Sequence, residues 1–153
     1  MKKLIYLIVV IVALGLIVVG CNPTVPPTEQ GNTGNLTRAT VTVLSGGSIQ
    51  EAIDAASAGD TIEVAAGTYN ETISITKSNF TIKSQSGDPS DTIIDANGAG
   101  GNVVTIADCS GVTFSGFTIT GAATRRNGIR MSGATGCTIS NIVVTGIGPL
   151  TVG

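Results

Sequence analysis

The chain has 153 residues, with eight Lys and Arg, ten Asp and Glu, no histidine and a formal net charge of −2. This acidic balance disfavours a nucleic-acid partner, because nucleic-acid-binding proteins concentrate Lys and Arg against phosphates. Without histidine the chain has no metal-ligand spacing, so neither a metal nor a cofactor is expected.

Residues 1–20 have the pattern of a secretory signal peptide. Two lysines precede an uncharged, mostly apolar run at 4–19, which as a helix would be about 24 Å long, shorter than the roughly 30 Å hydrocarbon core of a bilayer. The junction VVGC, ending at Cys21, resembles the lipobox of bacterial lipoproteins. That resemblance implies that Cys21 carries a lipid that anchors the protein to a membrane outside the cytoplasm. Because Asn22 follows the cysteine, the implied location is the outer membrane or the cell surface. An uncleaved signal anchor with an incidental cysteine is the alternative.

Residues 21–40 have a different composition from the rest of the chain. They are rich in proline and threonine and hold almost no large apolar side chain, which predicts a flexible tether. Residues 41–153 then leave about 110 residues for folding, enough for one domain.

The predicted domain begins with a short strand at Val41 and Val43, followed by a helix over 49–57. Ser48 and Glu51 have the spacing of a capping box, and Gly59 is expected to end the helix. A helix of this length is too short to persist alone, so it should cover the end of a larger structure, although a helix packed sideways on a sheet is also possible. Its apolar stripe consists of Ile49, Ala52, Ile53 and Ala56.

Strands dominate the rest of the chain, and the pattern repeats. Apolar residues between 104 and 121 map onto apolar residues between 129 and 146 at a constant offset, which places Val104 on Ile129 and Ile119 on Val144. An earlier copy runs from Ile73 to Ile93 or Ile94; its offset from the next copy is longer, and the excess is assigned to a surface loop at 84–90. Within each unit, apolar residues two apart predict three short strands joined by three corners.

A unit this short cannot bury its own apolar face, so it must stack on copies of itself. In the stack, Phe114 should lie between Ile82 and Ile139, and Cys137 should take the buried place of Val112. Cys109 falls in a turn at a different offset, which gives no reason to expect a disulfide.

The segment SIQEAIDAASAGDTIEVAAGTYNETISI resembles the opening of the pectin-lyase-like superfamily, and GVTFSGFTITG and GCTISNIVVTG resemble its repeats. The resemblance covers most of 48–146. It implies an all-β fold, a right-handed single-stranded parallel β-helix with three strands per coil and a short N-terminal capping helix. The members of that superfamily include pectin methylesterases, polysaccharide lyases, glycoside hydrolases and periplasmic or surface proteins with no known reaction, so the resemblance implies no single activity.

No catalytic set of that superfamily is visible, so whether the protein is an enzyme stays open. The candidates for binding an acidic, pectin-like polysaccharide are Arg125, Arg126 and Arg130, because guanidinium groups pair with carboxylates; solvated surface charges are the alternative. Asp95 and Asp108 are expected to be turn residues.

Three functions are compatible with the sequence: binding or processing of polysaccharide, a non-catalytic cell-surface or adhesin-like scaffold, and an accessory role in metal-enzyme maturation. The last rests only on similar repeats, and the absence of histidine disfavours it. The final residues supply no second cap, so we expect 41–153 to be truncated at its C-terminus; a complete small protein whose open end stacks on a partner is the alternative.

Overall fold

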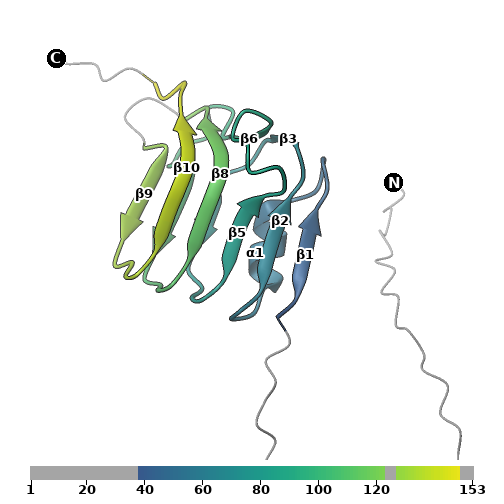
Figure 1. Cartoon of the computed structure of the whole chain (residues 1–153). Helices are drawn as coiled ribbons and strands as arrows, with labels where there is room; N and C mark the ends of the chain where they lie inside the picture. Colours follow the sequence, from purple (N-terminus) through teal and green to yellow (C-terminus); the bar gives the residue numbers. More distant parts are fainter. Residues whose placement is uncertain (1–37, 123–126, 149–153) are drawn as a thin grey trace, which may run out of the picture. The chain divides into compact units, whose positions relative to one another are not determined.

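The computed structural model describes residues 38–122 and 127–148, which form one helix and ten strands (Figure 1). The helix and the first strands lie at one end of the assembly, and β9 and β10 lie at the other (Figure 1). The elements are β1 (Thr40–Val43), α1 (Ile49–Ala55), β2 (Thr61–Val64), β3 (Gly67–Tyr69), β4 (Ile73–Ile75), β5 (Thr81–Ser84), β6 (Thr92–Asp95), β7 (Val104–Ala107), β8 (Thr113–Thr120), β9 (Ile129–Ser132) and β10 (Thr138–Val144).

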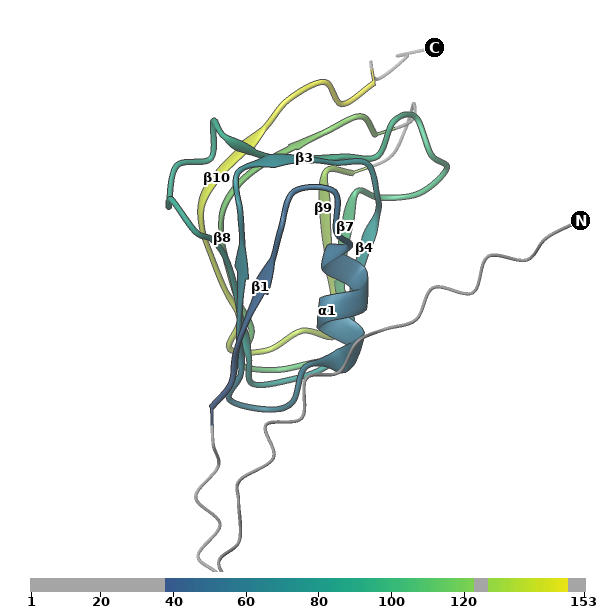
Figure 2. The same ribbon diagram turned by 90° about the vertical axis from the view of Figure 1, so that its right-hand side faces the viewer.

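All the strand pairs in these residues are parallel. One sheet has the order β1-β2-β5-β8-β6-β3, with β10 also paired to β8, and the other has the order β4-β7-β9. Seen along the stacking direction, the chain runs around an interior, with β1, β8 and β10 on one side, β3 on the next, and β4, β7 and β9 opposite (Figure 2). The expectation of a mainly β fold with one helix is confirmed.

Apolar side chains stack in the interior from one strand to the next. Phe114 is paired in register with Ile82 on one side and Ile139 on the other, as expected. Phe114 is fully buried, and its ring stacks on Phe117 with a centroid separation of 4.7 Å. The register continues beyond Ile82 to the buried Ile62 and then to Val41, which is 37% exposed.

The strand registers also confirm the repeat and locate its insertion. β7 pairs with β9 at the predicted offset, with Val104 opposite Ile129. Ile82 pairs with Phe114, whereas Ile94, beyond the predicted loop, pairs with Ile119. The sequence separation between Ile94 and Ile119 is shorter than that between Ile82 and Phe114 by the length of the loop at 84–90. The sequence left open whether Ile93 or Ile94 is the inward residue, and it is Ile94 that is fully buried.

One detail of the predicted repeat is wrong. The apolar pairs around Phe114 and Phe117 were expected to form two strands separated by a corner, but they belong to the single strand β8. Gly116 bends this strand with a φ of +84°, and an added Cβ there would overlap the Ser84 hydroxyl of the neighbouring strand. Glycine therefore turns the chain without ending its pairing.

The helix starts where expected, but a distant residue caps it. Ser48 Oγ accepts the N–H of Glu51 at 3.2 Å, which is half of the predicted capping box. The carboxylate of Glu71 accepts the N–H of Ile49 at 2.7 Å, the N–H of Gln50 at 3.2 Å and the Ser48 hydroxyl at 2.9 Å. A carboxylate here satisfies backbone donors and complements the helix dipole.

The helix ends at Ala55, earlier than predicted. Ala56 has an extended conformation, with ψ at 147°, so Gly59 is not the residue that terminates the helix. Lys77 Nζ instead donates to the carbonyl oxygens of Asp54 and Ala56, the latter at 3.0 Å. A lysine at this position satisfies the free carbonyl groups of the last turn.

Helix α1 also covers the free edge of β4. Ser74 N donates to Gln50 Oε1 at 2.7 Å, and Gln50 Nε2 donates to the Ser74 carbonyl at 3.2 Å. The side-chain amide of Gln50 thus supplies the donor and acceptor that another strand would provide, which protects an edge that could otherwise pair with another chain. Ile49, Ala52 and Ile53 fill the interior behind it.

Asp60 joins the start of the domain to the turn after the helix. Its carboxylate accepts the N–H of Ser57 at 2.8 Å and the N–H of Ala39 at 2.9 Å. These two hydrogen bonds, the one from Ser57 first, lower the pKa of Asp60 below its ordinary value of 3.8. Because Ala39 is held in this way and β1 begins at Thr40, the folded part starts slightly before the predicted boundary at residue 41.

Candidate functional site

A continuous row of threonines crosses the outer face of the larger sheet. In five strands of this sheet one threonine precedes the inward apolar residue, so the two-residue period of a strand turns its side chain outward. We call this row the threonine ladder; its members, paired in register in this order, are Thr40, Thr61, Thr81, Thr113 and Thr138. The two end threonines are exposed, and the three inner ones are half-buried.

A second polar row runs beside the threonine ladder, two positions further along each strand. Its central members, Glu63 and Lys83, form an ion pair with a distance of 3.0 Å between Lys83 Nζ and Glu63 Oε1. The pair neutralises its own charges, so the two rows together present hydroxyl groups on a face with little net charge. The other members are Thr42, Ser115 and Ser140.

The hydroxyl groups of the ladder share one spacing. Neighbouring strands in a sheet lie about 4.8 Å apart, so equivalent side chains repeat at that distance along the stack. Each threonine offers a hydrogen-bond donor, an acceptor and a methyl group. Such a surface can contact an extended ligand at several regularly spaced points.

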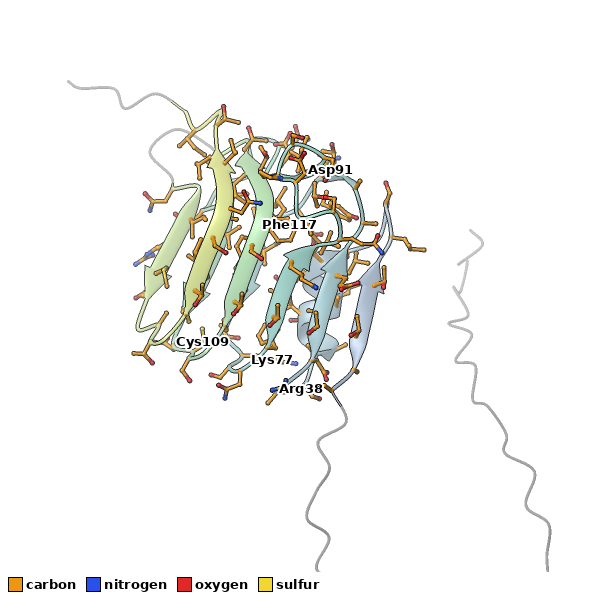
Figure 3. The ribbon with its side chains drawn as sticks, viewed as in Figure 1. Arg38, Lys77, Asp91, Cys109 and Phe117 are labelled. Atoms are coloured by element: carbon orange, nitrogen blue, oxygen red, sulfur yellow. The ribbon has the colours of Figure 1, made fainter. Side chains whose placement is uncertain are left out.

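A depression of about 300 Å³ lies beside the ladder at the strand starts. Its lining includes Thr61 and Thr81 from the ladder and the side chain of Arg38. The Arg38 stem lies against Gly59, where an added Cβ would stand 3.4 Å from Arg38 Cγ, an ordinary contact distance. Arg38 lies at the lower end of the sheet in the view of Figure 3, next to the start of β1. The depression thus places a guanidinium group, which binds carboxylates, next to hydroxyl groups.

The predicted arginine cluster is only partly within the described residues. Arg125 and Arg126 lie outside them. Arg130 lies on β9 in the smaller sheet, paired with Thr105 as the repeat predicts, and its side chain is exposed. Arg130 and the threonine ladder therefore belong to different sheets.

The two aspartates considered as candidates have local roles in turns. Asp95 Oδ1 accepts the N–H of Asn97 at 2.7 Å, and Asn97 has a φ of +48°. Asp108 itself has a φ of +50°. Both agree with the interpretation of these aspartates as turn residues.

Cys21, the predicted lipid attachment site, lies outside the described residues. Within residues 38–122 and 127–148, no helix is long and apolar enough to cross a membrane. The same residues contain no group of three His, Cys, Asp or Glu side chains placed to hold a metal ion.

Comparison with protein family models, with curated proteins and with solved structures gives no match to this chain. The candidate site therefore rests on the geometry of the described residues. The ladder was not predicted from the sequence. The signal was present as a threonine before the central apolar residue of five strands, but linking them required the correct register across the irregular offsets.

Proposed function

We propose that the protein is a lipid-anchored, extracytoplasmic right-handed parallel β-helix that binds polysaccharide along the threonine ladder. Parallel pairing between strands of successive repeats and the resemblance to pectin-lyase-like proteins support the fold. The basic and apolar N-terminus and the lipobox-like junction at Cys21 support anchoring outside the cytoplasm.

The observation that carries the binding function is the ladder itself. A polysaccharide presents hydroxyl groups and apolar C–H faces at repeating intervals, and the ladder presents hydroxyl and methyl groups at intervals of about 4.8 Å. Each hydrogen bond contributes only about 0.5 to 1.5 kcal/mol, but an extended chain makes several at once. The three inner threonines are half-buried, which restricts their side chains before a ligand arrives.

Acidic sugars would use the arginines. Arg38 lies at the depression beside the ladder, where a uronate carboxylate could pair with it while neighbouring sugars contact Thr61 and Thr81. In this proposal Arg125, Arg126 and Arg130 form a second contact for an acidic polymer. The exposure of the Arg130 side chain on β9 is consistent with this second contact.

A non-catalytic surface scaffold is the second candidate, and one observation favours it. Large apolar side chains are exposed on the last two strands, with Met131 46%, Val143 46% and Val144 50% exposed. Exposed apolar groups on the strands at one end of a stack are typical of surfaces that contact other proteins. In this alternative the ladder is a solvated face.

Affinity electrophoresis of the full-length chain in gels containing polygalacturonate or a neutral glucan tests the proposal. Thr81→Val combined with Thr113→Val removes two hydroxyl groups while keeping the β-branched shape. Two lost hydrogen bonds correspond to about 1 to 3 kcal/mol, so binding should weaken roughly 5- to 150-fold. The matched control is Thr68→Val, an exposed threonine on β3 that belongs neither to the ladder nor to the contact at Arg130.

The variant Arg38→Gln separates acidic from neutral ligands. It should weaken the binding of polygalacturonate and leave the binding of the neutral glucan unchanged, because only the former carries carboxylates. If wild type, the double threonine variant and its control migrate alike in every gel, the ladder is not a polysaccharide site and the scaffold function is favoured.

A further inference from the structure

Two cysteines lie at stacked corners of consecutive repeats. Cys109 is in the corner between β7 and β8, and Cys137 immediately precedes β10. The corners are joined through Thr135, whose N–H donates to the Cys109 carbonyl at 3.0 Å and whose carbonyl accepts the N–H of Gly111 at 3.0 Å. The backbone segments that carry the two cysteines therefore run side by side.

Both thiols also face the same region of the core. Cys109 is 5% exposed, and Cys137 is half-buried and packs against the core in the register position of Val112. Burial raises the pKa of the Cys109 thiol, and the adjacent Cys137 thiol raises it further, followed by the Asp108 carboxylate. The Cys137 thiol donates to the Thr135 carbonyl at 3.5 Å, the carbonyl that also accepts the N–H of Gly111, so the Cys137 sulfur lies beside the corner that holds Cys109.

The two cysteines lie across one corner of the stack and not directly opposite each other. Cys137 is opposite Val112, three residues along the chain from Cys109, and a disulfide between them needs Cα atoms about 4.4 to 6.8 Å apart. Both cysteines are free in this structure. The repeat period did not indicate this pair, because it aligns Cys109 with Ala134. Cys137 lies three residues after Ala134, on the other side of the corner.

We propose that Cys109 and Cys137 form a disulfide that fastens the β9–β10 repeat to the β7–β8 repeat. The more accessible Cys137, as a thiolate, attacks a disulfide oxidant and forms a mixed disulfide, releasing one thiolate of the oxidant. Cys109 then loses its proton and attacks the Cys137 sulfur, releasing the second thiolate. Two protein thiols are oxidised to one disulfide while the oxidant disulfide is reduced to two thiols.

The bond would strengthen the least buried part of the described fold. Ile139 and Ile142 in β10 are only partly buried, whereas their partners Phe114 and Phe117 in β8 are fully buried. A cross-link restricts the unfolded chain, and its effect should appear as a rise in Tm of roughly 10 °C on oxidation. An extracytoplasmic location, which is part of the proposed function, would provide oxidising conditions, but the chemistry requires only a disulfide oxidant.

The test uses the full-length chain with Cys21→Ser, equilibrated with oxidised glutathione and followed by intact mass and thiol labelling. We expect a monomer lighter by two hydrogen atoms, with no thiol left to label and a peptide map joining Cys109 to Cys137. Cys109→Ala should instead stop at the mixed disulfide and gain the mass of one glutathionyl group. Cys109→Ser serves the same purpose if the alanine variant does not fold, as judged by circular dichroism.

Three results would overturn the proposal. The first is that both thiols remain free at equilibrium with the oxidant. The second is that the parent chain stops at the mixed disulfide, as the Cys109 variants do. The third is that any disulfide formed links two chains rather than one. None of these results depends on polysaccharide binding, so the failure of one proposal is distinguishable from the failure of the other.

Discussion

Replacing Phe114 by alanine should remove the central side chain of the interior stack. The ring is fully buried between Ile82 and Ile139 and stacks on Phe117 at 4.7 Å. Because both neighbouring residues are held by their own strands, the surrounding core can collapse only partly into the space left by the ring.

The expected cost follows from that environment. Phe→Ala in a core lowers the free energy of unfolding by about 3 to 5 kcal/mol, which includes the lost transfer energy and the cavity. The stacked pair with Phe117 places this site towards the upper end of the range, since such pairs add about 0.5 to 1.5 kcal/mol beyond burial. For a single domain, whose stability is typically about 5 to 15 kcal/mol, this is a large fraction.

Urea unfolding of the full-length chain, followed by circular dichroism, measures the difference. Thr113→Ala is the matched control: it changes the adjacent residue of the same strand, whose half-buried side chain faces outward, and should cost less than about 1 kcal/mol. Equal losses in the two variants would show that the inward and outward faces of β8 are wrongly assigned. A changed m-value would require a three-state analysis before the two are compared.

Three other changes test different parts of the chain. Cys21→Ser should move the processed protein from the detergent phase to the aqueous phase of a phase-partitioning assay; identical partitioning of both forms would exclude a lipid anchor at that residue. Asp60 has a lowered pKa in the folded state, so its contribution to stability is present above the ordinary value of 3.8 and is lost as the pH falls through the folded pKa. Urea unfolding between pH 6 and about 2 should therefore show a shallower acid-induced loss for Asp60→Asn, and an unchanged slope would contradict this. Gly121→Ala should lower the Tm more than Gly87→Ala does, although both glycines have a φ of +76°. A Cβ at Gly121 would overlap Asp95 Oδ1, whereas nothing lies within 4 Å of a Cβ at Gly87. Equal shifts in Tm would mean that backbone strain alone determines the loss of stability.

The periodicity predicted most of the fold because the same physical requirement recurs in each repeat. Each inward position must be apolar, so the alternation marked the strands, and the constant offset gave the register of β7 with β9. The loop at 84–90 was recognisable from its glycine and proline. The merging of two strands at Gly116 was not, because glycine is equally suited to a corner and to a bend within a continuous strand.

Long-range polar partners could not be predicted from the sequence. Glu51 satisfied the local capping rule, yet Glu71, from beyond the next two strands, provides most of the N-terminal cap. The threonine ladder and the cysteine pair were missed for a related reason. Both contain neighbours whose separation in sequence differs from the common period, because the loop and the corners add or remove residues. A comparison at one fixed period therefore does not detect them.

The helix obtains both of its end caps from one short segment of chain. Glu71 and Lys77 flank β4, and Gln50 is bonded to Ser74 in the middle of that strand. During synthesis the helical residues therefore emerge well before the groups that complete them, and α1 cannot become stable until residue 77 is available. Helix and strand should then order and melt as one unit, so the amide protons of α1 and of Ser74 should exchange with solvent at a common rate set by a single opening event.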